Sequence, residues 1–393
     1  MRGLVLDAAS EPGLRQRITR LFARGRSRTQ DAPRSPSGRW LEAMGQLENA
    51  VLEAPRLLRL EGWVGSPRGG ATRLEVSAGG APLAVSGVQL GLPSPGVARF
   101  VPNLGNAATA AFRAHVPLDE TGLEGLRGRL LRVTPWFGDT AGLDLLGVAA
   151  PLVEPPTFEE LGLVSAGLPV AFEYLNYFLE FCELRPAAQV LDVGCGVGRM
   201  AYALAHHLTP PGRYEGFDVV AQCIDLAQRR FGELPHFRFQ RVDVVNRHYN
   251  PGGAQSAESF AFPYPDASFD LVFLASVFTH MRPSDVRHYL GEIRRVLRPG
   301  GHCLATAFLI DGEARRGLAG GRAPLPLRHP LEDFFVVDPA RPEAAIGYPE
   351  EVFLDWVRAR GFTVEALLRG CWSGRAGFTS YQDGLVLRSP GGR

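Results

Sequence analysis

The 393-residue sequence predicts two folded domains, a small all-β sandwich followed by an α/β domain with a mostly parallel sheet. From Leu57 to Leu146, short alternating runs are separated by Gly and Pro, which is typical of antiparallel strands. The stretch PLVEPPTFEELG (151–162) then interrupts helix and strand with its prolines. Beyond it, strand-like and helix-like segments alternate, which indicates a parallel sheet with helices on both faces.

These patterns divide the chain into three parts. Residues 1–50 are assigned to a basic, flexible N-terminal segment, 51–150 to the sandwich and 151–393 to the α/β domain, with a lid insertion at about 311–348. The segment LRQRITRLFARGRSR (14–28) fits a basic helix that would lie on a membrane surface, although a solvated, disordered tail is the favoured interpretation.

Composition excludes several classes of function. The formal net charge of +1 argues against a nucleic-acid binder. All basic residues are arginine, so Schiff-base chemistry and a phosphate-binding lysine loop are excluded. The five cysteines form no CxxC pair, and no His, Asp and Glu grouping has metal-ligand spacing, so neither a disulfide framework nor a metal site is predicted. No apolar run is long enough for a signal peptide or a membrane span, so we expect a cytoplasmic protein.

The first domain is predicted from five strand-like runs at 57–64, 72–80, 81–87, 109–118 and 129–136. This stretch resembles the β-sandwich modules that accompany some bacterial glycosyltransferases and methyltransferases, with Gly62 and Trp63 matching their glycine–tryptophan signature. Trp63 and Trp136 would stack on a sugar or, as most such residues do, pack in the core.

The α/β domain is predicted from its alternating elements. Strands are expected at 187–194, 213–219, 237–244, 269–276, 302–310 and 379–389. Helices are expected at 199–208, 221–232, 283–297 and 349–362. Between 311 and 348 lies a long segment, and loops of that length are usually lids or disordered. Its arginines and aromatic residues suit a cap that selects a polar acceptor.

A candidate ligand site follows the first strand of this domain. In VLDVGCGVG (190–198), three glycines stand between strand and helix, where ligands of open parallel sheets bind and where bare backbone permits close approach. The sixth position of a dinucleotide-binding GxGxxG turn is Arg199 here. Asp192 precedes the turn, where a carboxylate would repel a diphosphate and attract a cation. The cofactor is therefore expected to carry positive charge.

Two further acids end the next two strands. Asp218 is placed to accept hydrogen bonds from ribose hydroxyls, and Asp243 to accept one from the exocyclic amine of adenine. Three carboxylates on three successive strand ends suit S-adenosyl-L-methionine, which has both an ammonium and a sulfonium group.

From about Phe172 to Leu387 the chain resembles a class I S-adenosylmethionine-dependent methyltransferase. The resemblance is carried by VLDVGCGVG, GFDV, the DV of the third strand, FPYPDASFDLVFLASVFTHM and RVLRPGG. It implies a Rossmann-like fold with a seven-stranded, mostly parallel sheet and S-adenosyl-L-methionine as cofactor. The stretch VVNRHYNPGGAQSAESFAFPYPD (244–266) resembles a bacterial subgroup linked to glycan or natural-product tailoring.

The same resemblance implies a set of cofactor contacts. Asp192 and the turn residues would hold the methionine moiety, Asp218 the ribose, Asp243 with Val244 the adenine edge, and Leu274 with Ser276 the sulfonium side. Val219, next to Asp218, belongs to the same cofactor-binding set. The turn residues in that set are Gly194, Cys195, Gly196 and Gly198. For Cys195, a small packed residue is the favoured interpretation over a redox role.

His280, after the fourth strand, is the candidate general base, although many relatives have a histidine there that only packs beside the cofactor. Tyr174 and Tyr177 are second-rank candidates for closing over the cofactor. Tyr381 and Asp383 would serve the active-site edge or strand-end hydrogen bonding. A further pair, His206 and His207, is expected at the protein surface.

The predicted function is O-methylation of a sugar, glycan or related small molecule. Two alternatives remain open: N- or C-methyl transfer in secondary metabolism, and a non-catalytic protein that binds the cofactor and recruits partners through the sandwich.

Overall fold

The computed structural model describes residues 34–100, 104–163, 167–375 and 377–391. The chain forms two compact units, Met1–Glu180 with Arg199–His207, and Phe181–Gly198 with Leu208–Arg393. The predicted basic helix at 14–28 lies outside the described residues. Across the part that is described, every helix is too short or too polar to cross a membrane.

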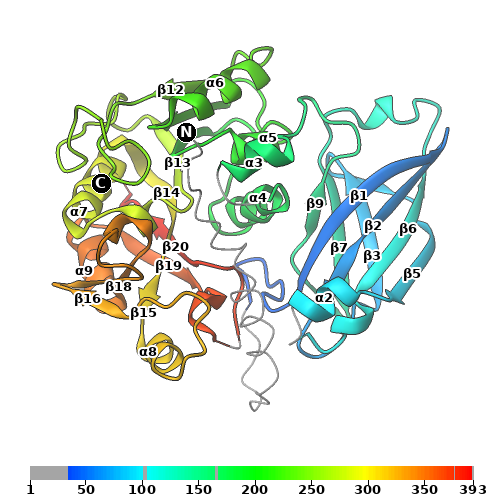
Figure 1. The fold of residues 1–393 in the computed structure, drawn as a ribbon. Coiled ribbons are helices and arrows are strands. Elements are labelled where there is room, and N and C mark those ends of the chain that lie inside the picture. The colour runs from blue at the N-terminus through cyan, green and yellow to red at the C-terminus, as the bar shows by residue number, and fades with distance from the viewer. Residues whose placement is uncertain (1–33, 101–103, 164–166, 376, 392–393) are drawn as a thin grey trace. The chain divides into compact units, whose positions relative to one another are not determined.

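The first unit contains an all-β region of two antiparallel sheets, as the strand pattern predicts (Figure 1). One sheet has the order β1 (Met44–Ala54), β2 (Leu57–Gly65), β6 (Ala111–Pro117), β5 (Ser86–Leu92). The other has the order β4 (Ala81–Leu83), β3 (Arg73–Ala78), β7 (Leu131–Phe137), β8 (Thr140–Ala141), and β9 (Leu145–Gly147) also pairs with β7. Leu60, Val76, Phe112 and Val133 come from both sheets and share one core, which joins the sheets.

Strand β1 corrects the predicted boundary, because it begins inside the segment 1–50 that was assigned to a flexible tail. Its side chains are half-buried or exposed, so the alternation that marks a strand is weak in its sequence. Pairing with β2 defines it instead. A Cβ atom on Gly62 would lie 2.1 Å from the Gln46 carbonyl oxygen, so this glycine permits the close approach of the two strands.

The helices of the first unit include α4, which carries both tyrosine candidates. Within the described residues they are α2 (Pro95–Phe100), α3 (Phe158–Gly162), α4 (Pro169–Phe181) and α5 (Arg199–Leu204), with the 3₁₀ turns η1 (Ala107–Thr109) and η2 (Glu124–Leu126). Tyr174 and Tyr177 are buried; Tyr174 packs against Tyr177, and the Tyr177 hydroxyl donates to Glu173, all on the same helix.

His206 was expected at the surface, and this expectation is wrong. Its side chain is 7% exposed and packs edge-to-face on Tyr202, with ring centroids 5.3 Å apart. Burial lowers the pKa of His206 to about 4, so the ring is neutral at pH 7. Its position just after a wholly buried helix explains the difference, because the segment 199–204 has no polar face.

The second unit is built on a seven-stranded, mostly parallel sheet within the described residues, which confirms the predicted architecture. The order is β12 (Phe237–Arg241), β11 (Arg213–Asp218), β10 (Gln189–Val193), β13 (Phe269–Leu274), β14 (Leu297–Ala307), β20 (Asp383–Arg388), β19 (Thr363–Leu368). Strands β12 to β14 are parallel, and β20 runs antiparallel to both its neighbours. The central strand β13 reads FDLVFL, an almost continuous apolar run, because both of its faces are buried.

Helices pack on this sheet. They are α6 (Ala221–Arg230), α7 (Pro283–Val296) and α9 (Glu350–Ala359), and the 3₁₀ turn η3 (Phe278–His280) follows β13. Helix α6 packs on β11 and β12, and α7 packs on β14. The amphipathic α7 buries Val286, Leu290 and Ile293 in the core beside the sheet.

The segment 311–348 is folded rather than structureless. It contains α8 (Gly312–Ala319), β16 (His329–Leu331), β17 (Phe334–Val336), η4 (Pro342–Ala344) and most of β18 (Ile346–Pro349), and it forms a small sheet with β15 (Leu309–Ile310). Leu325 and Leu327 belong to an apolar core with Trp372, which lies in η5 (Cys371–Ser373).

The buried carboxylate of Asp383 has a structural explanation. It accepts hydrogen bonds from the backbone N–H groups of Leu309 and Gly370 and from the indole N–H of Trp372. Of the two roles predicted for Asp383, this geometry supports strand-end hydrogen bonding.

Candidate functional site

The strand order creates a switch point in the second unit. Strand β10 pairs with β11 on one side and with β13 on the other. The chain proceeds from β10 to β11 and β12, then returns to β13 across β10. At such a point, the loops after the two central strands diverge and leave a crevice at their carboxyl ends, where ligands of these folds bind.

The glycine turn follows β10 at this point. The N–H groups of Gly194 and Cys195 both donate to the carbonyl of Phe217, at 2.9 and 3.0 Å, so the turn is held over the end of β11. Gly194, Gly196 and Gly198 have φ angles of 82°, 53° and 76°, a conformation that residues with a Cβ atom rarely adopt.

Replacing Gly194 with alanine is expected to weaken cofactor binding and to lower the free energy of unfolding by about 2 kcal/mol or more. Besides the strained φ, the new Cβ would lie 2.5 Å from Cγ2 of Val277. Gly300→Ala is the matched control, because Gly300 has a φ of 76° and open space around a Cβ. Chemical denaturation should show the larger loss for Gly194→Ala, and equal losses would contradict a role for the Val277 contact.

Asp218 ties the turn to the end of β11. One carboxylate oxygen accepts the N–H of Gly196 at 2.8 Å and the other accepts the N–H of Val220 at 2.8 Å. Burial raises the pKa of Asp218, and these backbone hydrogen bonds oppose the shift. Each oxygen retains a second lone pair, so the carboxylate has the capacity to accept the two hydroxyls of a ribose. This arrangement fits the predicted cofactor.

Asp192 lies deeper than the other two acids. Its side chain is 1% exposed, and it accepts the hydroxyl of Tyr214 at 2.7 Å. Burial, and then the carboxylates of Asp218 and Asp192, raise the pKa of the Cys195 thiol well above its usual range, so Cys195 is a protonated, packed residue. The contact of Asp192 with the ammonium of the cofactor stays a prediction.

Asp243 lies just beyond β12 and its side chain is 48% exposed, so it is available to a ligand. It accepts the side-chain amide of Asn250 at 3.3 Å, and the same amide donates to the carbonyl of Val244 at 3.0 Å. The side chain of Val244 is buried in the core, and Val219 packs against that core. Asn250 therefore holds the predicted adenine edge in place.

The two residues predicted for the sulfonium side differ in their surroundings. The side chain of Leu274 is fully buried in the core. Ser276 has a φ of 65°, and its N–H donates to the Thr306 hydroxyl at 2.8 Å. The Gln382 amide donates to the Ser276 hydroxyl at 2.9 Å, so the segment before β20 reaches the loop after β13.

His280 ends the same loop, and its geometry defines its tautomer. Its Nδ1 lies 2.9 Å from the carbonyl oxygen of Glu343. A carbonyl only accepts, so Nδ1 carries the proton and Nε2 of the neutral ring carries a lone pair. Burial lowers the pKa of His280 to about 4; the hydrogen bond to Glu343 opposes this shift, and the nearby His248 adds to it. The ring is therefore neutral and able to accept a proton at pH 7.

A loop that the sequence interpretation left unassigned brings further residues to His280. The Tyr249 hydroxyl lies 3.5 Å from Nε2 of His280, and the rings of His248 and His280 stack at 5.9 Å. Asn246 accepts the N–H groups of His248 and Tyr249 and donates to the carbonyl of His280 at 3.1 Å. The run NRHYN was the available signal, because Asn forms Asx turns and because loops often carry the residues of binding and catalysis.

Partial burial, and then the carboxylate of Asp218, raise the pKa of Tyr249. We call His248, Tyr249 and His280 the imidazole–phenol cluster. In the described part of the chain, no three His, Cys, Asp or Glu side chains gather in a group that could hold a metal.

Comparison with known proteins agrees with this geometry. Residues 190–301 match the family model described as a methyltransferase domain. The chain is 31% identical over 183 residues to a demethylmenaquinone methyltransferase of Deinococcus radiodurans, a match that covers 44% of this chain and 67% of the relative. It is 32% identical over 127 residues to a 27-O-demethylrifamycin SV methyltransferase of Amycolatopsis mediterranei, covering 32% of this chain and 41% of the relative.

A solved S-adenosylmethionine-dependent methyltransferase of Methanosarcina mazei is similar at 18% identity and a TM-score of 0.37, covering 53% of this chain and 95% of that one. A similarity at this TM-score is too low to support a family membership. The matches to the curated relatives span between a third and two thirds of the relatives' own lengths. The sequence relatives and the family model are sufficient: this chain belongs to the class I S-adenosylmethionine-dependent methyltransferases, and S-adenosyl-L-methionine is its cofactor.

Proposed function

We propose that this protein transfers a methyl group to a hydroxyl oxygen of a small molecule, with a sugar or glycan as the acceptor class. The observation that carries the proposal is the tautomer of His280. Its Nδ1 proton is held by the Glu343 carbonyl at 2.9 Å, which leaves the Nε2 lone pair to accept the proton of an acceptor hydroxyl.

The cofactor supplies an electrophilic methyl group on its sulfonium. The chain's own residues then have three tasks. The glycine turn and Asp218 orient the nucleoside end, and His280 accepts the acceptor proton at Nε2 as the oxygen attacks. The Glu343 carbonyl keeps the ring oriented and stabilises the positive charge that His280 gains. Alignment of this kind contributes roughly 7 to 11 kcal/mol in favourable cases.

Tyr249 supports a position for the acceptor hydroxyl beside His280. Its hydroxyl lies 3.5 Å from Nε2, just beyond ordinary hydrogen-bond distance, and its side chain is 44% exposed. An acceptor hydroxyl that takes the place of the Tyr249 hydroxyl, or that lies between it and His280, would be close enough to give its proton to Nε2. The polar rim of His248 and Tyr249 favours oxygen over the alternatives of N- or C-methylation, which were expected with an apolar pocket lacking His280.

The proposal extends to the rest of the chain. Residues 51–150 would form an accessory domain that holds an extended acceptor or a partner, and the segment 311–348 would cover the acceptor. Glu343 supports the second idea, because it belongs to that segment and its carbonyl contacts His280. The name of one relative, a 27-O-demethylrifamycin SV methyltransferase, refers to an O-demethyl compound and is consistent with an oxygen acceptor. We place the protein in the cytoplasm.

The test is product analysis with methyl-¹³C-labelled cofactor. Methyl glycosides of glucose, rhamnose and glucuronic acid, a catechol, ethanolamine and a quinol would be offered as acceptors, because O-, N- and C-methyl carbons have distinct NMR shifts. A methyl ether on a glycoside would support the proposal. A methyl ether on the catechol alone would overturn the sugar class, and an N- or C-methyl product, or no product despite cofactor binding, would overturn O-methylation.

A further inference from the structure

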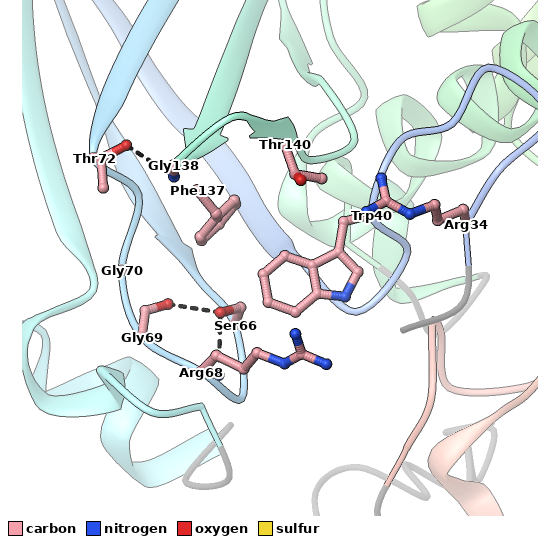
Figure 2. A pocket seen from close by; sticks show the side chains of 10 residues that line it. All are labelled: Arg34, Trp40, Ser66, Arg68, Gly69, Gly70, Thr72, Phe137, Gly138 and Thr140. Carbon is pink, nitrogen blue, oxygen red and sulfur yellow. Dashed lines mark hydrogen bonds between the residues drawn. The ribbon is translucent and has the colours of Figure 1, made fainter. Parts of the chain in front are cut away.

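The all-β region of the first unit contains a cavity of about 380 Å³ whose lining residues all belong to that unit (Figure 2). Its walls come from the segment 34–40, the loop 66–72 and the turn 137–140. This volume lies within the range of small-molecule sites in proteins. The cavity is lined by aromatic side chains, two guanidinium groups and glycine backbone. Each of these features can contact a bound small molecule.

Neither arginine of the cavity pairs with an acid in the part of the chain that the structure describes. Arg68 has no ion pair in the described part of the chain; its guanidinium carbon lies 5.3 Å from the centroid of the Trp40 ring. Arg34 donates to the carbonyl of Gly38 at 2.9 Å. Several other arginines of the same region are paired with acids, as Arg73 is with Glu75 at 2.7 Å. Two guanidinium groups at one cavity, without a carboxylate partner among the described residues, favour an anionic ligand.

Trp40 provides an independent observation. The residue is 6% exposed, and its indole Nε1 has no hydrogen-bond partner among the described residues. A buried N–H group without an acceptor is unfavourable and rare in folded proteins. Figure 2 shows the nitrogen-bearing edge of the indole on the side where the Arg68 guanidinium lies. An oxygen atom bound at Arg68 would therefore lie on the side that this donor faces.

The remaining walls suit a ring with both apolar and polar faces. Phe137 meets Trp40 edge-to-face, with centroids 5.3 Å apart, and provides an apolar wall. Gly69 and Gly138 have φ angles of 133° and 62°, and a Cβ at either would meet nothing within 4 Å. The cavity is thus lined by open backbone at two positions where only glycine fits without strain. Carbohydrate rings present C–H groups to aromatic side chains and hydroxyls to backbone and polar groups.

We propose that this cavity binds an anionic sugar, with the anionic group on Arg68 and Arg34 and the ring against Trp40 and Phe137. A carboxylate or a phosphate would provide the anion. This proposal does not depend on which molecule the protein methylates, because none of the cavity's lining residues belongs to the second unit.

The experiment is titration of the full chain with D-glucuronate, glucose 6-phosphate, glucose and inorganic phosphate. Binding would be followed by calorimetry and by the indole N–H resonances, with Trp40→Phe identifying the Trp40 signal. We expect glucuronate or glucose 6-phosphate to bind with a submillimolar Kd and to shift that signal. Arg68→Gln should weaken binding at least tenfold, whereas the control Arg73→Gln should not.

Each binding result supports or contradicts a defined part of the proposal. Binding of glucuronate alone identifies a carboxylate sugar, binding of glucose 6-phosphate alone identifies a phosphate sugar, and either supports the site. Glucose binding as tightly as its anionic derivatives would overturn the role of the arginines. Inorganic phosphate binding as tightly as glucose 6-phosphate would overturn the role of the aromatic walls. No binding of either anionic sugar, or full binding by Arg68→Gln, would overturn the site. Arg68 is exposed, so loss of folding is not expected, and a thermal melt would verify this.

Discussion

Replacing Asp218 with alanine is expected to raise the Kd for S-adenosyl-L-methionine by at least about 100-fold in isothermal titration. Hydrogen bonds to a charged group contribute about 1.5 to 3 kcal/mol each, and two ribose hydroxyls would lose this acceptor. The N–H groups of Gly196 and Val220 would lose it as well, at 2.8 Å each, so the glycine turn would no longer be tied to β11. The same loss is expected for S-adenosylhomocysteine, because both ligands share the nucleoside.

The matched control is Asp225→Ala. Asp225 is an exposed carboxylate on α6, and its removal changes the net charge equally without touching the turn. Asp218→Asn should bind with intermediate affinity, since the amide keeps one acceptor oxygen. If Asp218→Ala binds the cofactor as the unaltered protein does, Asp218 is not the ribose ligand and the alignment of this turn with its family is wrong.

The second large effect is expected at His280. Replacement by asparagine should lower kcat by about 100-fold to 10,000-fold, the range of general base catalysis, and leave the Kd of the cofactor unchanged. The asparagine amide can still donate to the Glu343 carbonyl in the place of Nδ1, so the loop geometry is retained. The substitution removes Nε2 with its lone pair, together with the ring that stacks on His248. Steady-state kinetics with the acceptor identified above, beside calorimetry with the cofactor, would separate the two quantities.

The pH dependence tests the same residue. The base form is required, and the pKa of His280 is lowered to about 4, so kcat should be nearly equal at pH 6 and pH 8 and should fall only as the pH approaches 4. With an ordinary histidine pKa near 6.5, kcat at pH 6 would be about a quarter of its value at pH 8. A full kcat in His280→Asn would show that the histidine only packs beside the cofactor, the other role considered for it.

Much of the site was predictable because its residues stand at fixed places in the strand pattern. The glycine turn, Asp218 and Asp243 follow successive strands, and the carboxyl ends of parallel strands meet at one edge of a sheet. The burial of Asp192 beneath the turn was not predictable, because it depends on Tyr214, 22 residues away. Likewise, the stacking of His248 on His280 joins two loops whose sequence separation gives no signal.

The sequence by itself determined the α/β class of the second unit, the β-strands of the first and the position of the glycine turn, because these depend on local periodicity and on glycines with a positive φ. Which segments pack over these elements, and which tautomer His280 adopts, depended on the tertiary structure alone. The segment 311–348 became a small sheet because Trp372, far along the chain, completes its core. The Glu343 carbonyl of that segment sets the tautomer of His280. Strand β1 and the burial of His206 depended on pairing and packing partners, which periodicity in one segment does not encode.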